Sequence, residues 1–358
     1  RPPSPRRARH PRRAPRRARR RAPRRPSHRR RDRASVPTAL AATPDGRLFY
    51  AERSGTIRVW QDGGARVFAM VPTVTTEAGG GYSERGLLGL AVSPRFAEDR
   101  FVYAFYSNED RAHQDIVRFT DCAGEARDRR LLVQLPAGSD CCHKGGRIAF
   151  GPDATLFVTL GDQHVSSAAQ DTGDVRGKVL RYNADGGVPG DNPFGGGNPV
   201  WAYGFRNPFG LSVSASGQVA VTSNGPTGDA GSPRTGYDTV IASVARGTGY
   251  QWPVCYGYSH PIAPAASCPP GQPGPDWSSE TTTAVPTGAA WVDGDGPAAY
   301  AGRLVFCTLN GGMRILTPGS PATVVPGPAG CRLDVVQGPD RAVYYADSSG
   351  IYREPGRS

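Results

Sequence analysis

The chain has 358 residues, with 43 Lys and Arg against 31 Asp and Glu and a formal net charge of +12 at pH 7. The excess is confined to residues 1–33, which hold 17 Arg and one Asp, so the rest of the chain is mildly acidic. These numbers exclude a basic surface over the whole protein, and we do not expect the folded part to bind nucleic acid. No apolar run reaches the ~18 residues that a membrane-spanning helix needs.

Residues 1–33 are built mainly from Arg, Pro and Ala and show no apolar periodicity, which predicts a disordered tail. Two interpretations stay open. The tail is an arm for nucleic acid or another anionic surface, or it is a stretch translated from a wrong upstream start. The second is favoured by the 41 Arg against two Lys, which indicate GC-rich coding, and by the opening residue, Arg1.

From residue 34 onward, one phrase recurs, in which a Pro-Asp or Gly turn leads into a short run of β-branched and aromatic residues. Clear copies occupy residues 43–50, 151–158 and 338–345, and weaker copies occupy 216–221 and 301–306. Pro and Asp favour the turn, and the residues that follow favour a strand. Helical periodicity is scarce, which argues against a TIM barrel.

We therefore predict an all-β fold, a single six-bladed β-propeller over residues 34–358. About 325 residues at roughly 40–55 per blade allow about six blades. A strand from residues 36–60 is expected to pair with the C-terminal strands near 343–353 and close the ring. The segment 255–285, rich in Pro, Gly, Ser and Thr, is expected to be a long loop over one face.

The seven cysteines show no CxxC spacing with His, so a zinc site is not expected. Their number in a chain rich in Gly and Pro indicates an oxidising compartment, and so a secreted or extracytoplasmic protein. We expect the bonds Cys255–Cys268 and Cys307–Cys331. The odd count leaves one thiol over, or an unusual bond between the adjacent Cys141 and Cys142.

Five segments, in this order, resemble the signature motifs of the soluble quinoprotein glucose/sorbosone dehydrogenases, in particular the aldose sugar dehydrogenase branch. They are Glu84-Arg85-Gly86-Leu87-Leu88-Gly89, His143-Lys144-Gly145-Gly146-Arg147 with Phe150-Gly151-Pro152-Asp153, Gly161-Asp162, Gly204-Phe205-Arg206-Asn207-Pro208, and Asn224-Gly225-Pro226 followed by Asp238 and Gly249-Tyr250-Gln251-Trp252-Pro253. Each motif alone is weak, but their common order is specific.

The resemblance implies that the protein oxidises an aldose, or a similar polyol or aldehyde, with pyrroloquinoline quinone (PQQ) as hydride acceptor. By this resemblance His143 is the general base, and imidazole suits that role because its pKa lies near neutrality. Asp162 orients the imidazole ring, and Arg206 stabilises the negative charge that develops on the quinone. Glu84 and Asn207 are implied as cofactor contacts.

The resemblance also implies Ca²⁺. The carbonyls of Gly225 and Pro226 match those that hold the ion beside the quinone in the family, and Ca²⁺ accepts such oxygens. Asp238 and the Tyr250 carbonyl match a structural Ca²⁺ site, at a slightly longer spacing. The partners implied are a small sugar substrate and an external electron acceptor.

The chain departs from the family at the positions that meet the carboxylates of the quinone. Asn310 replaces a lysine, Cys331 and Leu333 replace two arginines, and Arg332 is shifted by one residue, which on a strand would turn it to the opposite face. Charge-assisted hydrogen bonds contribute ~1.5–3 kcal/mol each, so their loss weakens binding by orders of magnitude. Either the quinone is held differently, with Lys144 or Arg147 compensating, or the protein keeps the propeller without the cofactor.

Two alternatives to a quinoprotein dehydrogenase therefore remain. One is a non-catalytic propeller that binds a glycan or a protein, which the missing arginines favour. The other is a Ca²⁺-dependent lactonase-type hydrolase, which would need several carboxylates at the axis, and the sequence shows no clear set.

Overall fold

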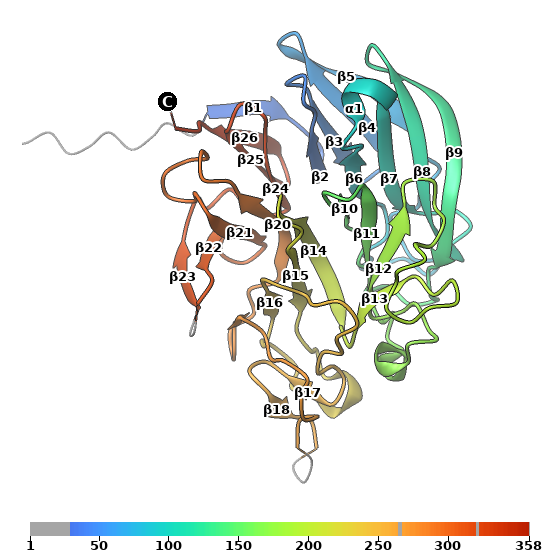
Figure 1. Cartoon of the computed structure of the whole chain (residues 1–358), viewed down its shortest axis with the longest axis vertical. Helices are drawn as coiled ribbons and strands as arrows, with labels where there is room; N and C mark the ends of the chain where they lie inside the picture. Colours follow the sequence, from blue (N-terminus) through green and yellow to red (C-terminus); the bar gives the residue numbers. More distant parts are fainter. Residues whose placement is uncertain (1–28, 264–266, 320–321, 358) are drawn as a thin grey trace, which may run out of the picture.

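The computed structural model describes residues 29–263, 267–319 and 322–357, and Figure 1 shows their strands arranged as six sheets around a central axis. Each sheet has four antiparallel strands, and its first-named strand below lies at the axis. The first sheet is β2 (Pro37–Ala42), β3 (Leu48–Glu52), β4 (Thr56–Gln61) and β5 (Gly64–Met70). The second is β6 (Leu87–Val92), β7 (Phe101–Ser107), β8 (His113–Cys122) and β9 (Glu125–Pro136). The third is β10 (Ile148–Phe150), β11 (Thr155–Leu160), β12 (Lys178–Asn183) and β13 (Val200–Tyr203).

The last three sheets follow the same plan, except that the outer strand of the fourth sheet is β19 and the outer strand of the sixth sheet is β1. The fourth is β14 (Asn207–Val213), β15 (Val219–Asn224), β16 (Thr239–Ile241) and β19 (Trp277–Ser278). The fifth is β20 (Pro286–Val292), β21 (Arg303–Thr308), β22 (Arg314–Thr317) and β23 (Thr323–Pro326). The sixth is β24 (Asp334–Gln337), β25 (Val343–Asp347), β26 (Gly350–Glu354) and β1 (Arg29–Arg33).

This arrangement confirms the predicted six-bladed β-propeller. Within the described ranges, helical structure is limited to α1 (Phe96–Asp99) and two 3₁₀ turns, η1 (Ser166–Gln170) and η2 (Asp229–Gly231). The repeated phrase has one structural meaning in all three clear copies, because each copy connects an inner strand to the second strand of its blade. In the first copy the backbone N–H of Gly46 donates to the Thr43 carbonyl at 3.0 Å, and Gly46 takes the positive φ of 86° that the turn requires.

The hydrophobic core is divided into six clusters, each between two neighbouring blades. Between the first and second blades, for example, Phe49 from β3 packs in one cluster with Leu87 from β6 and Tyr106 from β7. Since both faces of a blade are covered, strands such as β3 and β11 are buried along their whole length. The rigid sheets therefore hold the loops at each end of the axis.

The closure of the ring differs from the prediction. Strand β1 pairs with β26, with Arg29 opposite Arg353 and Arg33 opposite Gly350. Residues 36–60 form the first blade and do not supply the closing strand. The Arg-rich composition of residues 29–33 concealed this strand, since pairing with an existing edge needs backbone groups and no apolar pattern. Residues 1–28, and with them most of the predicted tail, lie outside the described residues.

The expected loop at 255–285 is long but not featureless. It carries a two-stranded sheet, β17 (Cys255–Tyr256) with β18 (His260–Pro261), before it supplies β19 to the fourth blade (Figure 1). Cys255 is bonded to Cys268, and Cys307 on β21 is bonded to Cys331 just before β24. Both expected disulfides are confirmed, and they suit an oxidising compartment. In the described residues, no helix has the length and apolarity needed to cross a membrane.

Candidate active site

The predicted site residues gather at one end of the propeller axis. Glu84 lies just before β6, His143 a few residues before β10, and Arg206 and Asn207 at the start of β14. Inner strands of a propeller run in the same direction, so their first residues meet at one mouth of the ring. The fold thus brings together residues that are more than 120 positions apart in the chain, as the 3.2 Å contact between Asn207 and Glu84 shows.

His143 and Asp162 form a buried pair. Nδ1 of His143 lies 2.5 Å from Oδ1 of Asp162, and the two side chains are 4% and 0% exposed. The close approach depends on Gly161, because a Cβ at this position would lie 2.1 Å from the His143 carbonyl oxygen. The imidazole therefore presents only Nε2 to the rest of the site.

The Asp162 carboxylate is fixed by donors on both oxygens. Trp252 donates its indole N–H to Oδ2 at 2.8 Å, and the backbone N–H of His164 donates to Oδ1 at 3.0 Å. These two groups can only donate, so they orient the carboxylate as an acceptor for the ring of His143. Trp252 lies inside the motif that the sequence analysis singled out, but its contact with Asp162 was not foreseen.

Burial lowers the pKa of His143 below its usual value of 6.5, and the positive charge of Arg206 adds to this effect. The hydrogen bond to Asp162 and the charge of Glu84 oppose it. Because the lowering prevails, His143 is neutral at neutral pH and can accept a proton.

Arg206 is buried and paired with Asp229, which the sequence analysis did not identify. Nε of Arg206 lies 2.7 Å from Oδ2 of Asp229, and Nη2 donates to Oδ1 of Asp229 at 3.0 Å and to the Thr227 hydroxyl at 2.7 Å. Burial acts to raise the pKa of Asp229, but its bonds with Arg206 outweigh this and lower the pKa to about 2. No motif marks Asp229 in the sequence, since it lies in the loop that contains η2.

Asp229 also approaches the buried pair, because ligand-type atoms of His143, Asp162 and Asp229 lie within 4.8 Å of one another. The oxygens of Asp229 are already engaged by Arg206 and by the backbone N–H of Thr227. The three residues and Arg206 therefore form one network around the imidazole, in which the guanidinium offsets the charge of the Asp229 carboxylate.

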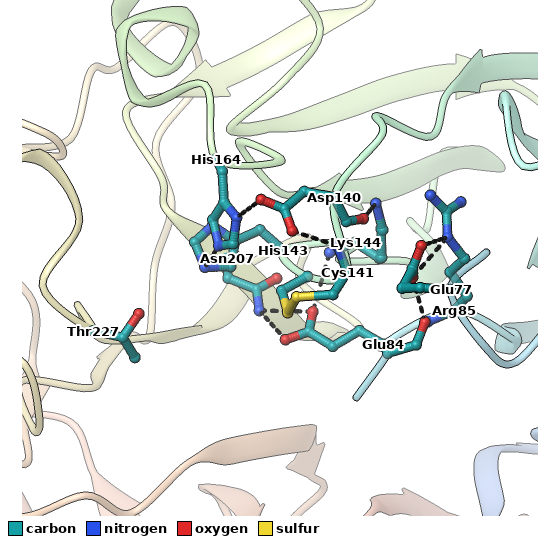
Figure 2. Close-up of a disulfide and its surroundings, with 12 residues drawn as sticks. Glu77, Glu84, Arg85, Asp140, Cys141, His143, Lys144, His164, Asn207 and Thr227 are labelled. Atoms are coloured by element: carbon teal, nitrogen blue, oxygen red, sulfur yellow. Dashed lines mark hydrogen bonds and ion pairs between the residues drawn. A yellow bond between two sulfur atoms is a disulfide. The ribbon is translucent and has the colours of Figure 1, made fainter. Parts of the chain in front are cut away.

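Glu84 and Asn207 connect the starts of three inner strands. The Asn207 amide donates to Glu84, while its Oδ1 accepts from the backbone N–H of Gly145 at 3.3 Å. Glu84 also accepts from the backbone N–H of Lys144 at 3.2 Å. Figure 2 shows both side chains beside His143.

The adjacent cysteines Cys141 and Cys142 are bonded to each other, directly before His143 (Figure 2). The carbonyl of Cys141 accepts from the backbone N–H of Glu84 at 2.9 Å, which ties this segment to the start of the second blade. Cys122 is the free cysteine among the seven, and it is exposed. The odd count left open a free thiol or a bond between the adjacent cysteines, and the structure has both.

The predicted calcium residues divide into two groups. Gly225 and Pro226 line a cavity together with Arg206 and Trp252. Asp238 instead accepts backbone N–H groups from Gly225 at 2.8 Å, Ala284 at 2.8 Å and Val285 at 2.9 Å. The Tyr250 carbonyl accepts from the Gln170 side chain at 2.7 Å. Asp238 and Tyr250 thus have protein donors where a cation was expected.

The cations considered as substitutes at the cofactor-carboxylate positions are engaged elsewhere. Nζ of Lys144 donates to the carbonyls of Ala137 and Asp140, the latter at 2.6 Å. The Arg147 guanidinium donates to carbonyls of three blades, which belong to Thr38, Leu88 and Leu333.

Arg332, in contrast, does not turn away from the position of Asn310. It precedes β24, so the alternation of a strand does not apply to it, and Nη1 donates to the carbonyl of Leu309 at 2.8 Å. The guanidinium is exposed on the rim beside Asn310. Cys331 beside it is buried, and the orientation of Arg332 relative to the cofactor stays a prediction.

Comparison with known proteins agrees with this geometry. The family model described as glucose/sorbosone dehydrogenase matches residues 34–351. The chain belongs to the glucose/sorbosone dehydrogenase family.

Two curated relatives are named as sugar dehydrogenases. An aldose sugar dehydrogenase of Escherichia coli is 31% identical over 62% of this chain and 60% of its own length. Quinoprotein glucose dehydrogenase B of Acinetobacter calcoaceticus is 29% identical over 62% of this chain and 51% of its own length. The chain thus matches little more than half of the length of these two relatives.

Among solved structures, the soluble aldose sugar dehydrogenase of E. coli in its apo form is 25% identical, with a TM-score of 0.74 over 91% of this chain and 99% of that one. The family and these relatives indicate an oxidoreductase of the sugar dehydrogenase type.

Proposed function

We propose that this protein oxidises an aldose, or a related sugar or polyol, with PQQ as hydride acceptor and Ca²⁺ beside it. The observation that carries the proposal is the buried His143–Asp162 pair next to Arg206 at the mouth of the axis. When hydride leaves a carbon atom, the hydroxyl group on that carbon must lose its proton. A neutral imidazole in a fixed orientation can accept this proton.

The residues of the site suit a cation next to a quinone. Oδ1 of Asn224 is buried without a hydrogen-bond partner in the described part of the chain, and Asn224 lines the same cavity as Gly225 and Pro226. Ca²⁺ binds amide and backbone carbonyl oxygens. We therefore assign Asn224, Gly225 and Pro226 as its ligands. Asp238 and the Tyr250 carbonyl are less suited, because N–H groups already occupy them.

The role of each residue follows from its contacts. Bound PQQ would supply the hydride acceptor. His143 takes the hydroxyl proton on Nε2, since Nδ1 faces Asp162. Asp162 stabilises the resulting imidazolium without itself becoming protonated. Arg206 supplies fixed positive charge, while Glu84 and Asn207 keep the strand starts together and offer polar contacts to the cofactor.

The fit at the carboxylate end of the cofactor is weaker. Cys331 is buried in a disulfide and Leu333 offers no charge, whereas Arg332 is a rim cation available beside Asn310. We expect the affinity for PQQ to depend on Arg332. The substrate class, the external electron acceptor and an extracytoplasmic location, which three disulfides favour, are parts of the same proposal.

The test uses the full chain, because β1 belongs to the last sheet. PQQ is titrated by calorimetry with and without Ca²⁺, and dye reduction is then followed with a panel of aldoses. We expect Ca²⁺-dependent binding and sugar-dependent turnover that falls by at least about a hundredfold in His143→Ala. His113→Ala is the matched control, since His113 also pairs with a carboxylate, that of Asp110, but lies exposed and apart from the site.

Failure to bind at roughly tens of micromolar PQQ would overturn the proposal. The protein would then be a propeller of this family whose ligand, a glycan or a protein, is bound without the cofactor.

A further inference from the structure

A second histidine–carboxylate pair faces the proposed base. Nε2 of His164 lies 3.1 Å from Nε2 of His143, and the ring centroids are 4.0 Å apart with 81° between the planes. Nδ1 of His164 is bonded to the Asp140 carboxylate. His164 and Asp140 are 30% and 49% exposed, whereas His143 and Asp162 are buried. Figure 2 shows the ring of His164 between Asp140 and His143.

The backbone places His164 there specifically. Gln163 and His164 both adopt positive φ, at 53° and 61°, and the N–H of His164 is held by Asp162. Left-handed conformations are uncommon for such residues, and two in succession need support from the surrounding structure. The loop therefore turns sharply after Asp162, and this turn brings the second ring back onto the first.

The hydrogen-bond pattern fixes how many protons the two rings share. Each Nδ1 faces a carboxylate and so carries a hydrogen. In two neutral rings both Nε2 atoms would then be acceptors, and two acceptors at 3.1 Å repel each other. One additional proton between the rings turns this contact into a charge-assisted hydrogen bond. The observed arrangement thus corresponds to a pair that holds one extra proton, which lies on Nε2 of His164 while the neutral His143 accepts the hydrogen bond.

We propose that His164 is the residue that exchanges protons with His143, and that it alternates with the substrate hydroxyl at Nε2 of His143. This inference rests on the proposed function, because it names the route by which the proton leaves the base. Nδ1 of His143 is taken by Asp162, so the hydroxyl and His164 compete for the same nitrogen. His164 must therefore swing aside when the sugar binds.

The steps balance without any further reactant. The substrate hydroxyl gives its proton to Nε2 of His143, and bound PQQ would supply the acceptor for the hydride from the same carbon. When the product has left, His164 returns and takes the proton from His143 on its own Nε2. Asp140 stabilises the imidazolium of His164, which is partly exposed and releases the Nε2 proton to water.

The first test needs neither cofactor nor turnover. In quinone-free protein with ¹⁵N-labelled histidine, we expect a scalar coupling between the two Nε2 nuclei across the shared hydrogen. We expect the coupling to be lost in His164→Gln and kept in His113→Ala. In the unchanged chain the His113 ring contacts Asp110 and, in the described residues, no second ring. Absence of the coupling in the unchanged protein at every pH from 5 to 8 would overturn the shared-proton arrangement.

The second test separates proton exchange from a structural role. In the PQQ-loaded enzyme, we expect His164→Ala to lower kcat at least about tenfold, with an unchanged or lower KM for the sugar because Nε2 of His143 is uncovered. Added imidazole should restore kcat in this variant but not in His143→Ala. An unchanged kcat, or a loss that imidazole does not relieve, would overturn the proposal. If no sugar is oxidised at all, the proposed function fails, while the coupling still reports on the two rings.

Discussion

Trp252 donates its indole N–H to Oδ2 of Asp162 at 2.8 Å, across 90 positions of the chain. The bond connects the loop after the fourth blade's β16 to the buried pair at the start of the third blade. Asp162 is fully buried, so its second oxygen has no access to water as a substitute donor.

We expect Trp252→Phe to leave that oxygen unsatisfied and to lower the free energy of unfolding by ~1–3 kcal/mol. The carboxylate also becomes free to rotate, so kcat should fall about tenfold while KM changes less. Denaturant unfolding and dye-reduction kinetics measure the two effects. Trp291→Phe is the control, because the indole N–H of Trp291 has no hydrogen-bond partner in the described residues. If both variants lost the same free energy of unfolding and the same kcat, the smaller ring would explain the losses and the hydrogen bond to Asp162 would not.

The lowered pKa of His143 predicts the pH dependence of the reaction. The base works when it is neutral, so the acidic limb of kcat/KM should lie below 6.5. Arg206 contributes to this lowering, so Arg206→Gln should move the limb to higher pH as well as reduce the rate. The pH profile of both proteins checks this. A limb above 6.5 in the unchanged enzyme would show that Asp162 outweighs burial.

The same shift makes a prediction about stability. The folded pKa of His143 is depressed, so at pH below 6.5 the unfolded chain binds this proton more readily than the folded protein. The contribution of His143 to the free energy of unfolding therefore falls as pH drops from 6.5 through the folded pKa. Urea unfolding of quinone-free protein at pH 7 and pH 5 should show a smaller decrease for His143→Gln than for the unchanged chain. A larger decrease for His143→Gln than for the unchanged chain would contradict the lowered pKa of His143.

Asp238 is expected to stabilise the protein without any metal. Its carboxylate accepts three backbone N–H groups, including that of Gly225. We predict that Asp238→Ala lowers the free energy of unfolding by about 3 kcal/mol to the same extent with Ca²⁺ and with a chelator. Thermal unfolding under both conditions measures this, with Asp62→Ala in an exposed turn as the control. A loss seen only with Ca²⁺ would instead make Asp238 a metal ligand.

The disulfides predict a simple thiol count. With three bonds among seven cysteines, one free thiol per chain should react under denaturing, non-reducing conditions, and peptide mapping should place it at Cys122. Because Cys122 is exposed, the same thiol should react in the native protein. Three reactive thiols, two of them at Cys141 and Cys142, would show that the bond before His143 does not form.

The repeating part of the structure was predictable from the sequence. The turn-and-strand phrase occurs in five of the six blades, each time between the inner strand and the second strand, so its copies indicated the propeller before any coordinates. Closure by residues 29–33 was not predictable, because a strand that adds to an open edge needs only main-chain groups, and its arginines pointed to disorder.

The site residues that belong to family motifs were predictable. The residues whose positions depend on the conformation of a loop were not. Glu84, His143, Asp162, Arg206 and Asn207 were all identified from the motifs, and the structure brings them together. Asp229 and His164 were missed, because each reaches its partner through a loop with non-helical or left-handed residues. Such paths leave no periodic signal in a single sequence.

Arg147 closes the axis of the ring. Its guanidinium is fully buried at the level where the inner strands begin, and it binds Thr38, Leu88 and Leu333 from three blades. The cavity on its other side is lined by the later residues of all six inner strands and opens at the opposite end of the ring. In the described residues, the Arg147 side chain therefore lies between this cavity and the end of the axis that carries His143. If the proposed function holds, we expect a domain fused at the far mouth, or a tether to an electrode there, to leave the approach to His143 from the other end unobstructed.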